Sequence, residues 1–564
     1  MKTFYKGLSC LLLTARTLFL PAQERDLTAL TGAAAIEELD EEEYERLESL
    51  RATPVRINTA SLAQLQSCGL FTRFQALSLT DYRARNGDIL SATELGLIDG
   101  FSPERAHALA PFLSFFSQGI PGQAGRDRLH HELLARAEYR NGLSGYAAKY
   151  KLAKDGSGSL ALAARAGARE KPGAPDTWSF HAVKYFRKRA GKILLGDYNA
   201  RFGQGLALWN GFSMSGLTTA ESFARHPTGL SPAWSFSPDG PMRGLAGDLT
   251  LRNVSLSAAA AFPGLRARMD GNPKAPVSAF GVFNAAWTGR TAELSATAIW
   301  GPEQDGPASK LAADFRWTPG QVGGFGELAW DLRSRSLATV GGLIWTPGYQ
   351  KKVSLLVRHY PVGFGADLSG GVRAGTRSSG ESGIAAGLRL PWLRLTIDYA
   401  SMPAREIAQT RILCLLPLTL PKDWTLTPRI SLRWRNGTLR QEYRLETAWD
   451  HSPWLAKLRS DLVRCNGTAW LAYAEGGRKT ERWRLYARVG LFKVDAWDDR
   501  IYVYERDAPG CFNVPAYYGR GFNASLSGGV RWRQHKLFLR IGGIRYVTDK
   551  PGRFECRLQY SWSR

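Results

Sequence analysis

Arginine is the residue type with the most chemistry to offer in this sequence. It recurs at alternate positions in several C-terminal segments, opposite a face of large apolar side chains. The candidates are Arg433, Arg435, Arg440, Arg444, Arg482, Arg484, Arg488, Arg531 and Arg533. A guanidinium group binds phosphate or carboxylate through paired N–H donors and stays charged at any physiological pH. The spacing therefore predicts a basic surface that binds polyanions.

A second candidate set falls between residues 72 and 105, around the predicted N-termini of helices. It consists of Thr72, Arg73, Arg83, Arg85, Gly100, Ser102 and Arg105. Free backbone N–H groups at a helix N-terminus, together with the helix dipole, attract phosphate. We therefore expect this region to bind the phosphate backbone of DNA, without sequence preference and less tightly as salt increases.

Histidine and cysteine show no catalytic or metal-binding pattern. The eight histidines stand in no motif with a nucleophile and a carboxylate, and the six cysteines include no C-x-x-C pair. Hydrolytic sites and structural zinc sites need such arrangements. We therefore predict that the protein is not an enzyme and has neither a metal nor a cofactor.

The elements that must position the C-terminal arginines are strands. From residue 128 to residue 564 apolar residues recur with a period of two, as in "FECRLQYSWSR" at the C-terminus. A soluble antiparallel sheet alternates in the same way, but no helical segment follows that could cover one. A closed barrel turns its apolar face to lipid and its charged face to a wet lumen. We predict a large antiparallel transmembrane β-barrel of roughly 20–26 strands.

Composition and charge agree with this interpretation and leave the ligand open. The 564 residues carry a formal net charge of +24, which favours nucleic acid, anionic lipid or acidic glycans as partners without choosing among them. The alternative to a barrel is a row of soluble β domains or a propeller. A propeller would show a repeat of about 40–50 residues, and no such repeat is present.

The first 127 residues divide into four segments. A basic start followed by an apolar run predicts a signal peptide over residues 1–22. Residues 23–50 contain the acidic stretch "IEELDEEEYERLESL", which predicts an amphipathic helix with a solvated face. Residues 51–116 have the helix and turn pattern of a small all-α domain, and residues 117–127 are a linker rich in Gly, Pro and Gln.

The all-α segment resembles the tandem helix-hairpin-helix domain of ComEA-type competence DNA receptors. The match covers residues 57–111. It includes Ile57-Asn58-Thr59-Ala60, Asp81-Tyr82-Arg83 and Gly100. Where that family has Pro-Gly-Ile-Gly, this chain has Gly69-Leu70-Phe71-Thr72. The resemblance implies DNA binding, and the lost glycines weaken close approach to phosphate at the first hairpin.

The barrel segment also resembles a family. "LGDYNARFGQGLALWNGF" (195–212) and "RIYVYERDAPGCFNVPAYYGRG" (500–521) are similar to segments of predicted outer-membrane barrels of Bacteroidota. Those proteins carry an N-terminal helix-hairpin-helix domain. The resemblance implies the outer membrane of a Gram-negative bacterium, with the helical domain in the periplasm.

Two functions of different classes follow from these patterns. The first is an outer-membrane barrel that binds or passes anionic cargo such as DNA. The alternative is a structural or assembly barrel in which Arg–Glu pairs fill the lumen and the helical module docks a protein, with no role in transport. The expected partners are outer-membrane lipid, DNA or another polyanion, and a periplasmic protein.

Overall fold

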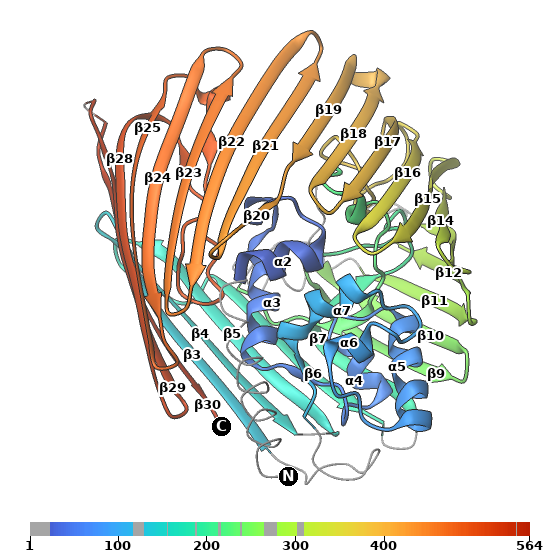
Figure 1. Ribbon diagram of the computed structural model, residues 1–564. Helices are drawn as coiled ribbons and strands as arrows, with labels where there is room; N and C mark the ends of the chain where they lie inside the picture. Colours follow the sequence, from blue (N-terminus) through green and yellow to red (C-terminus); the bar gives the residue numbers. More distant parts are fainter. Residues whose placement is uncertain are drawn as a thin grey trace, which may run out of the picture.

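The computed structural model describes residues 23–116, 129–154, 156–186, 189–211, 216–236, 240–263, 279–301, 309–548 and 550–564. The predicted signal peptide (1–22) and the predicted linker (117–127) lie outside these residues. The described chain forms an N-terminal helical domain, residues 23–116, and a barrel that begins at Leu129 (Figure 1).

The helical domain is built from short helices. Its elements are α2 (Gln23–Thr31), η1 (Ile36–Glu38), α3 (Glu41–Ala52), β1 (Val55–Arg56), α4 (Leu62–Ser67), α5 (Arg73–Asn86), α6 (Ala92–Leu95), α7 (Pro103–Leu109), η2 (Ala110–Phe112) and β2 (Leu113–Ser114). The single acidic helix predicted over 23–50 is instead α2, η1 and α3. Gly32, with a φ of 75°, follows α2 directly, in the left-handed conformation typical of a residue just past a helix end. Among the described residues, no helix is both long and apolar enough to cross a membrane.

Local sequence explains why the two hairpins fold although the first lacks both of its usual glycines and the second keeps only Gly100. Ser61 and Thr72 form capping boxes that start α4 and α5. Gly69 supplies the left-handed backbone of the first turn, with a φ of 71°. Phe71 and Phe101 fill the space between the hairpins, their rings packed edge to face at 5.9 Å. The hairpin fold therefore rests on capping and apolar packing.

Within the described ranges, 24 antiparallel strands close into one barrel. In chain order they are β3 (Leu129–Arg140), β4 (Leu143–Lys154), β5 (Gly158–Arg169), β6 (Thr177–Tyr185), β7 (Ala190–Arg201), β9 (Met242–Leu251), β10 (Val254–Ala261), β11 (Phe280–Thr288), β12 (Ala292–Trp300), β13 (Lys310–Trp317), β14 (Val322–Asp331), β15 (Ser336–Gly348), β16 (Lys351–Tyr360), β17 (Glu381–Leu390), β18 (Leu393–Met402), β19 (Ile407–Leu415), β21 (Trp424–Arg435), β22 (Thr438–His451), β23 (Trp454–Arg464), β24 (Thr468–Lys479), β25 (Trp483–Val494), β28 (Gly519–Trp532), β29 (His535–Tyr546) and β30 (Arg553–Ser563). Short strands β8 (Gly229–Pro232) and β20 (Leu418–Leu420) extend the sheet locally, and β26 (Ile501–Tyr502) pairs with β27 (Ala516–Tyr517). Pairing of β3 with β30 closes the barrel. The number of strands is even and falls within the predicted range.

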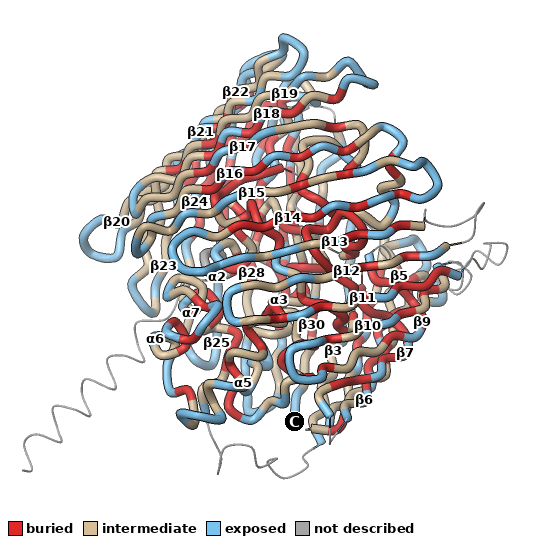
Figure 2. The backbone as a smooth tube through the Cα atoms, turned by 90° about the vertical axis from the view of Figure 1, so that its right-hand side faces the viewer, coloured by how far each residue is buried: buried red, intermediate tan, exposed pale blue. Residues whose placement is uncertain are grey.

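The two faces of the barrel wall divide as the alternation predicts. On β25, Leu485 and Val489 are 46% and 61% exposed, whereas Arg488 is 3% exposed. Figure 2 shows this alternation of buried and exposed positions along many strands. Tryptophans gather near one rim, where Trp424 packs on Trp449 and Trp532 stacks on His535, as in the aromatic girdle of a membrane barrel. An apolar outer surface with such a rim fits the outer membrane.

The two ends of the barrel differ in their connections. One end, here the short-turn mouth, carries tight connections such as 252–253, 391–392 and 533–534. The barrel begins and ends there, where His131 and Arg564 exchange backbone hydrogen bonds of 2.9 and 3.0 Å. The other end, the loop mouth, carries the long connections between β7 and β9, β16 and β17, and β25 and β28. Described parts of these connections fold inward and are largely buried.

The helical domain lies at the short-turn mouth, and part of it enters the lumen. Residues 36–52, here called the acidic plug, contact strands on opposite walls: Glu41 pairs with Arg165 of β5, and Glu38 with Arg429 of β21. Figure 1 shows α2 and α3 enclosed between these two sides of the barrel. The segment predicted to be solvated is therefore largely buried inside a lumen of opposite charge.

Candidate functional site

The candidate site is the interface between the acidic plug and the basic lumen wall. Carboxylates of the plug meet cations of six strands at ion-pair distance. The pairs are Glu37 with Arg444 (3.5 Å) and Arg459, Glu38 with Arg429 (2.9 Å), Glu41 with Arg165 (3.3 Å), Glu43 with Arg201 (3.6 Å) and Glu45 with Lys149 (2.6 Å). Both partners of the Glu45–Lys149 pair are at least nine-tenths buried. The lumen thus holds an anionic segment of its own chain, which satisfies charges that burial would otherwise make costly.

Glu37 is the most connected carboxylate of the plug. It pairs with Arg459 and Arg444 and accepts a hydrogen bond from the backbone N–H of Tyr504 at 3.2 Å. Burial alone would raise the pKa of Glu37, but attraction to Arg459 and Arg444 outweighs burial and lowers the pKa well below its ordinary value. The carboxylate is therefore ionised whenever the plug is in place. Asp461 bonds the same two arginines, at 2.6 and 2.8 Å, and completes a four-charge cluster.

The helix that carries the other plug carboxylates is stabilised at its start. Asp40 is the N-cap of α3 and accepts a hydrogen bond from the backbone N–H of Glu43 at 2.8 Å. The first turn is acidic, which suits the positive end of the helix dipole. Burial, reinforced by the charges of Glu42 and Glu43, raises the pKa of Asp40 to about 7. One carboxyl of the docked plug therefore changes its charge near neutral pH.

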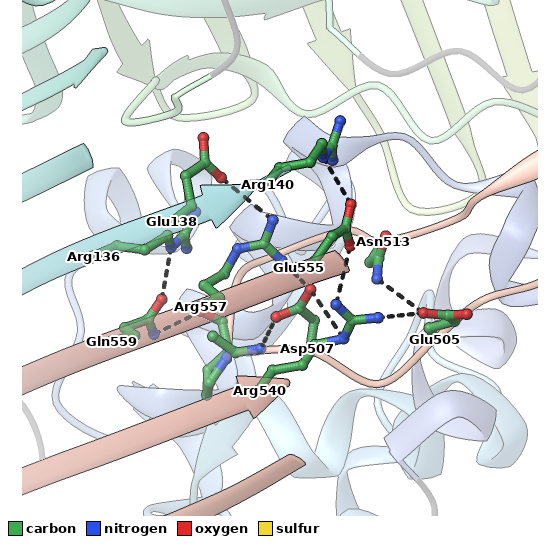
Figure 3. A network of polar contacts seen from close by, with 12 residues as sticks. Arg136, Glu138, Arg140, Glu505, Asp507, Asn513, Arg540, Glu555, Arg557 and Gln559 are labelled. Atoms are coloured by element: carbon green, nitrogen blue, oxygen red, sulfur yellow. Dashed lines mark hydrogen bonds and ion pairs between the residues drawn. The ribbon is translucent and has the colours of Figure 1, made fainter. Parts of the chain in front are cut away.

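The loop between β25 and β28, residues 495–518, neutralises arginines near the barrel seam. Arg540 is 2% exposed and pairs with three carboxylates, those of Glu505, Asp507 (3.7 Å) and Glu555 (3.1 Å). Arg557 pairs with Asp507 and with Glu138 of β3. Figure 3 shows the loop carboxylates reaching between the arginines of β29 and β30. The loop is therefore fixed to the wall by charge.

The glycine-rich stretch after β7 forms an anion nest that the protein itself fills. Backbone N–H groups of Gln204, Leu206 and Ala207 donate to the carboxylate of Glu327, at 2.6, 3.0 and 3.0 Å. Gly203 and Gly205 have positive φ, which turns these groups toward one point. The stretch therefore belongs to a loop that folds into the lumen and binds the barrel wall at Glu327 of β14.

Seven of the nine predicted lumen arginines lie on the lumen face of strands. Three are paired there: Arg440 with Glu442 (2.6 Å), Arg444 with Asp461 (2.8 Å), and Arg488 with Glu475 (Nε to Oε2, 2.9 Å). Arg484 lies over the ring of Phe538. Arg433, Arg435 and Arg531 are on the same face by strand register, are exposed, and have no carboxylate partner among the described residues.

The other two predicted lumen arginines are not in the wall. Arg482 lies between β24 and β25, and Arg533 between β28 and β29, so both belong to turns at the short-turn mouth. The prediction failed here because a period of two can be continued through a tight turn without any change in the sequence pattern. Arg533 has a φ of 53°, which shows that the strand has ended.

The predicted DNA-binding residues are largely engaged within the protein. Thr72 and Ser102 are the N-caps of α5 and α7 and accept backbone N–H groups of their own helices. Arg73 donates to Ser257 of the barrel wall at 3.1 Å and lies over the ring of Phe202. The hairpin that begins at Thr72 therefore faces the wall.

The remaining basic candidates split between internal bonds and the surface. Arg83 donates to the backbone carbonyl oxygens of Ile57 and Ala60, and Arg105 to those of Leu30 and Leu70. Burial, with the nearby positive charges of Arg46 and Arg316, lowers the pKa of Arg105 to about 10.

Gly100 and Arg85 complete the set. Gly100 accepts a hydrogen bond from Gln75 at 2.8 Å. Arg85 is 66% exposed and pairs with Asp81 at 3.0 Å. The structure thus separates the seven candidates and forms no shared basic patch from them.

A side chain of the plug occupies the first hairpin turn. Arg46 of α3 donates to the carbonyl oxygens of Cys68 and Gly69, at 3.4 and 3.2 Å. The same guanidinium pairs with Glu43 at 2.6 Å. The turn that would approach a phosphate in a DNA-binding hairpin is therefore joined to the acidic plug.

Two cavities flank the plug at the short-turn mouth. The larger, of about 510 Å³, lies beside residues 28–37 and is lined by Arg389, Arg394, Lys457 and Lys479, among others. The smaller, of about 360 Å³, lies beside the end of α3 and is lined by Arg482, Arg484 and Arg531. Both have the size of ligand pockets and more basic than acidic side chains in their walls.

The sequence prediction missed that the acidic residues 37–45 lie inside the lumen and pair with its wall. The available indication was the sign of charge. The one strongly acidic stretch precedes a barrel whose inner face is basic, and buried charge in a barrel needs a partner. Helical periodicity alone does not indicate whether the charged side of this stretch faces water or the lumen of a barrel.

Comparison with known proteins gives one family match, which covers the helix-hairpin-helix region, and several solved structures of low similarity. Residues 51–114 match the family described as helix-hairpin-helix motif. No curated protein matches the sequence. The P pilus usher (PapC) translocation pore is similar at 10% identity, over 77% of this chain and 99% of that chain, with a TM-score of 0.36. Pseudomonas aeruginosa OccK3 (OpdO) is similar at 9% identity, over 78% of this chain and 96% of that chain, with a TM-score of 0.30. Pseudomonas aeruginosa OprD is similar at 8% identity, over 78% of this chain and 95% of that chain, with a TM-score of 0.30.

Proposed function

We propose that the protein is an outer-membrane channel for anionic cargo whose resting state is closed by the acidic plug. One observation carries the proposal: carboxylates of residues 37–45 occupy cations that project into the lumen from strands on both sides of the barrel. A surface that holds the protein's own anions has the charge and geometry to hold other anions. Release of the plug leaves that surface open to cargo.

The connections of the barrel support one orientation of the proposed channel. In transmembrane barrels short turns face the periplasm and long loops face the outside. The helical domain lies at the short-turn mouth, where the barrel also begins and ends. We therefore place the helical domain in the periplasm, so that release of the plug depends on periplasmic conditions or a periplasmic partner.

The cargo is recognised by the lumen wall in this proposal, not by the helical hairpins. DNA is one member of the proposed class of anionic cargo. The hairpin starting at Thr72 faces the wall, and Arg46 occupies the first turn. DNA that used the channel would therefore meet the arginines of the wall after the plug moves.

A charge exchange between plug and wall tests the proposal. Glu38 pairs with Arg429 at 2.9 Å, and Arg411 is 4.0 Å away. We expect Glu38→Arg and Arg429→Glu, each alone, to increase conductance in planar bilayers, because each places like charges together. The double variant restores the attraction and should return conductance toward the wild-type level.

The same measurement distinguishes the alternative of a permanently filled barrel. In such a barrel neither single variant conducts while it still folds and inserts. Selectivity gives a second criterion, since a lumen lined by arginine favours anions over cations in the open state. Conductance in the double variant as high as in both single variants would mean that the pair does not hold the plug.

A further inference from the structure

Three basic side chains stand next to one another on the lumen face near the short-turn mouth. Lys352 of β16 lies directly opposite Arg389 of β17, and Arg389 lies directly opposite Arg394 of β18. Side chains at directly opposed positions of antiparallel strands point to the same face and approach closely. Like charges in such positions repel, so this arrangement is unfavourable unless an anion lies between them.

The protein compensates only part of the charge of these three cations. Glu221, from the loop between β7 and β9, pairs with Arg389 and also attracts Lys352 and Arg394 through its charge. Glu104 of α7 lies nearby, but its carboxylate accepts the backbone N–H of Gln350 at 2.7 Å. Lys352 and Arg394 have no carboxylate at ion-pair distance among the described residues. The cluster therefore keeps an excess of positive charge, in contrast to the paired arginines deeper in the lumen.

An open space adjoins this cluster. Arg389 and Arg394 line the cavity of about 510 Å³ that separates the helical domain from the wall. Lys457 and Lys479 line the same cavity from β23 and β24. A small molecule that enters from the short-turn mouth can thus meet cations on two sides.

We propose that this cavity is a binding site for a multiply charged oxyanion, held by Arg389 and Arg394 and attracted by the charge of Lys352 next to Arg389. The ligand class follows from the chemistry of the donors, because guanidinium and ammonium groups bind phosphate and carboxylate oxygens with charge-assisted hydrogen bonds. The role of the site as an entrance for cargo rests on the proposed channel function. Binding itself requires only the closed structure.

The position of the site relates binding to opening. Arg444 and Arg459, which hold Glu37 of the plug, line the same cavity. An oxyanion there competes with Glu37 for these arginines and repels its carboxylate. Because a ligand shifts an equilibrium toward the state it binds better, the ligand favours release of the plug.

Titration calorimetry on the full-length protein in detergent tests the site, with inorganic tripolyphosphate as the probe. Wild-type protein should bind it, with affinity that falls as salt increases. The double variant Lys352→Gln/Arg394→Gln should bind at least about tenfold more weakly, since it loses one charged donor of the cavity wall and one neighbouring positive charge. Arg389 stays in place because it pairs with Glu221.

The matched control removes two charges from exposed connections at the loop mouth, outside the barrel strands. Arg335 lies between β14 and β15, and Arg405 lies between β18 and β19. The variant Arg335→Gln/Arg405→Gln has the same net charge as the test variant and should bind tripolyphosphate like wild type. Equal losses in both variants would mean that diffuse charge attracts the probe and no built site exists. Absence of wild-type binding at low ionic strength would also overturn the proposal.

The outcome separates this inference from the channel proposal. Binding that disappears in Lys352→Gln/Arg394→Gln supports the site even if no variant conducts. Conductance that responds to the Glu38–Arg429 exchange, together with no tripolyphosphate binding, supports the channel and overturns the site.

Discussion

If the protein is the proposed channel, replacement of Glu37 by glutamine should shift it from its plugged to its open state. The side chain keeps its size but loses its charge, and with it the ion pairs to Arg444 and Arg459. Glutamine can still accept the backbone N–H of Tyr504, so that hydrogen bond survives. The change therefore isolates the ionic part of plug docking.

The expected magnitude follows from what remains in the cluster. Removal of one partner from a buried ion pair costs about 3–5 kcal/mol when the other charge is left alone. Here Asp461 still bonds both arginines, at 2.8 and 2.6 Å, so the cost approaches that of a hydrogen bond to a charged group, about 2 kcal/mol. Since about 1.4 kcal/mol corresponds to a factor of ten, the open-to-plugged ratio should rise about 30-fold.

Single-channel recording in planar bilayers measures this ratio directly as open probability. The matched control is Asp81→Asn, which removes a carboxylate from an exposed pair with Arg85 at 3.0 Å, away from the barrel. Such a pair contributes below about 1 kcal/mol, so the control should behave like wild type. An open probability of Glu37→Gln equal to that of the control, in a protein with unchanged strand content, would refute the idea that this carboxylate holds the plug.

Three other predictions concern pH, DNA and the inward loop. Because burial raises the pKa of Asp40 to about 7, the docked plug retains a proton that a released plug loses above the ordinary value of 3.8. Open probability should therefore increase from about pH 4 to about pH 7. Asp40→Asn, which keeps the N-cap, should weaken this dependence, to which Glu42 also contributes because burial raises its pKa. A profile unchanged in the variant would exclude Asp40 as the cause. Duplex DNA binding by the full-length protein, measured across a salt series, should not change in Arg85→Gln, whereas a clear loss of affinity would identify the exposed side of α5 as a DNA-binding surface. Arg540→Met removes the positive charge that three buried carboxylates share. The variant should therefore lower the free energy of unfolding by about 3–5 kcal/mol and expose residues 495–518 to protease. Arg520→Met, which breaks an exposed ion pair, should change both measurements little. Equal melting temperatures in these two variants would show that the network in Figure 3 does not hold the loop.

The fold was largely predictable because its rules are local. Alternation with a period of two assigns each wall residue to lipid or lumen, and it placed Arg444 and Arg488 correctly. It failed at Arg482 and Arg533, where the chain turns without a break in the pattern. The helix-hairpin-helix domain could likewise be recognised from ordered local matches. The match of residues 51–114 to the helix-hairpin-helix motif confirms this prediction.

The candidate site was only half predictable. The sequence indicated which arginines face the lumen, because that depends on strand periodicity. The sequence did not indicate that residues 36–52 would pair with these arginines. Helical spacing predicts which side of a helix is apolar and which is charged, but not whether water or protein surrounds the charged side.

The sequence by itself determined the closed barrel, its two faces and the helical module, since each follows from repeated local geometry. Only the tertiary structure decided that the lumen is occupied and by what. Glu37 and Arg459 are 422 positions apart, and no periodicity connects residues at such a separation. They meet because a basic lumen excludes enough water to make unpaired charge costly, and the acidic N-terminal segment is the part of the chain that can relieve that cost from the short-turn mouth.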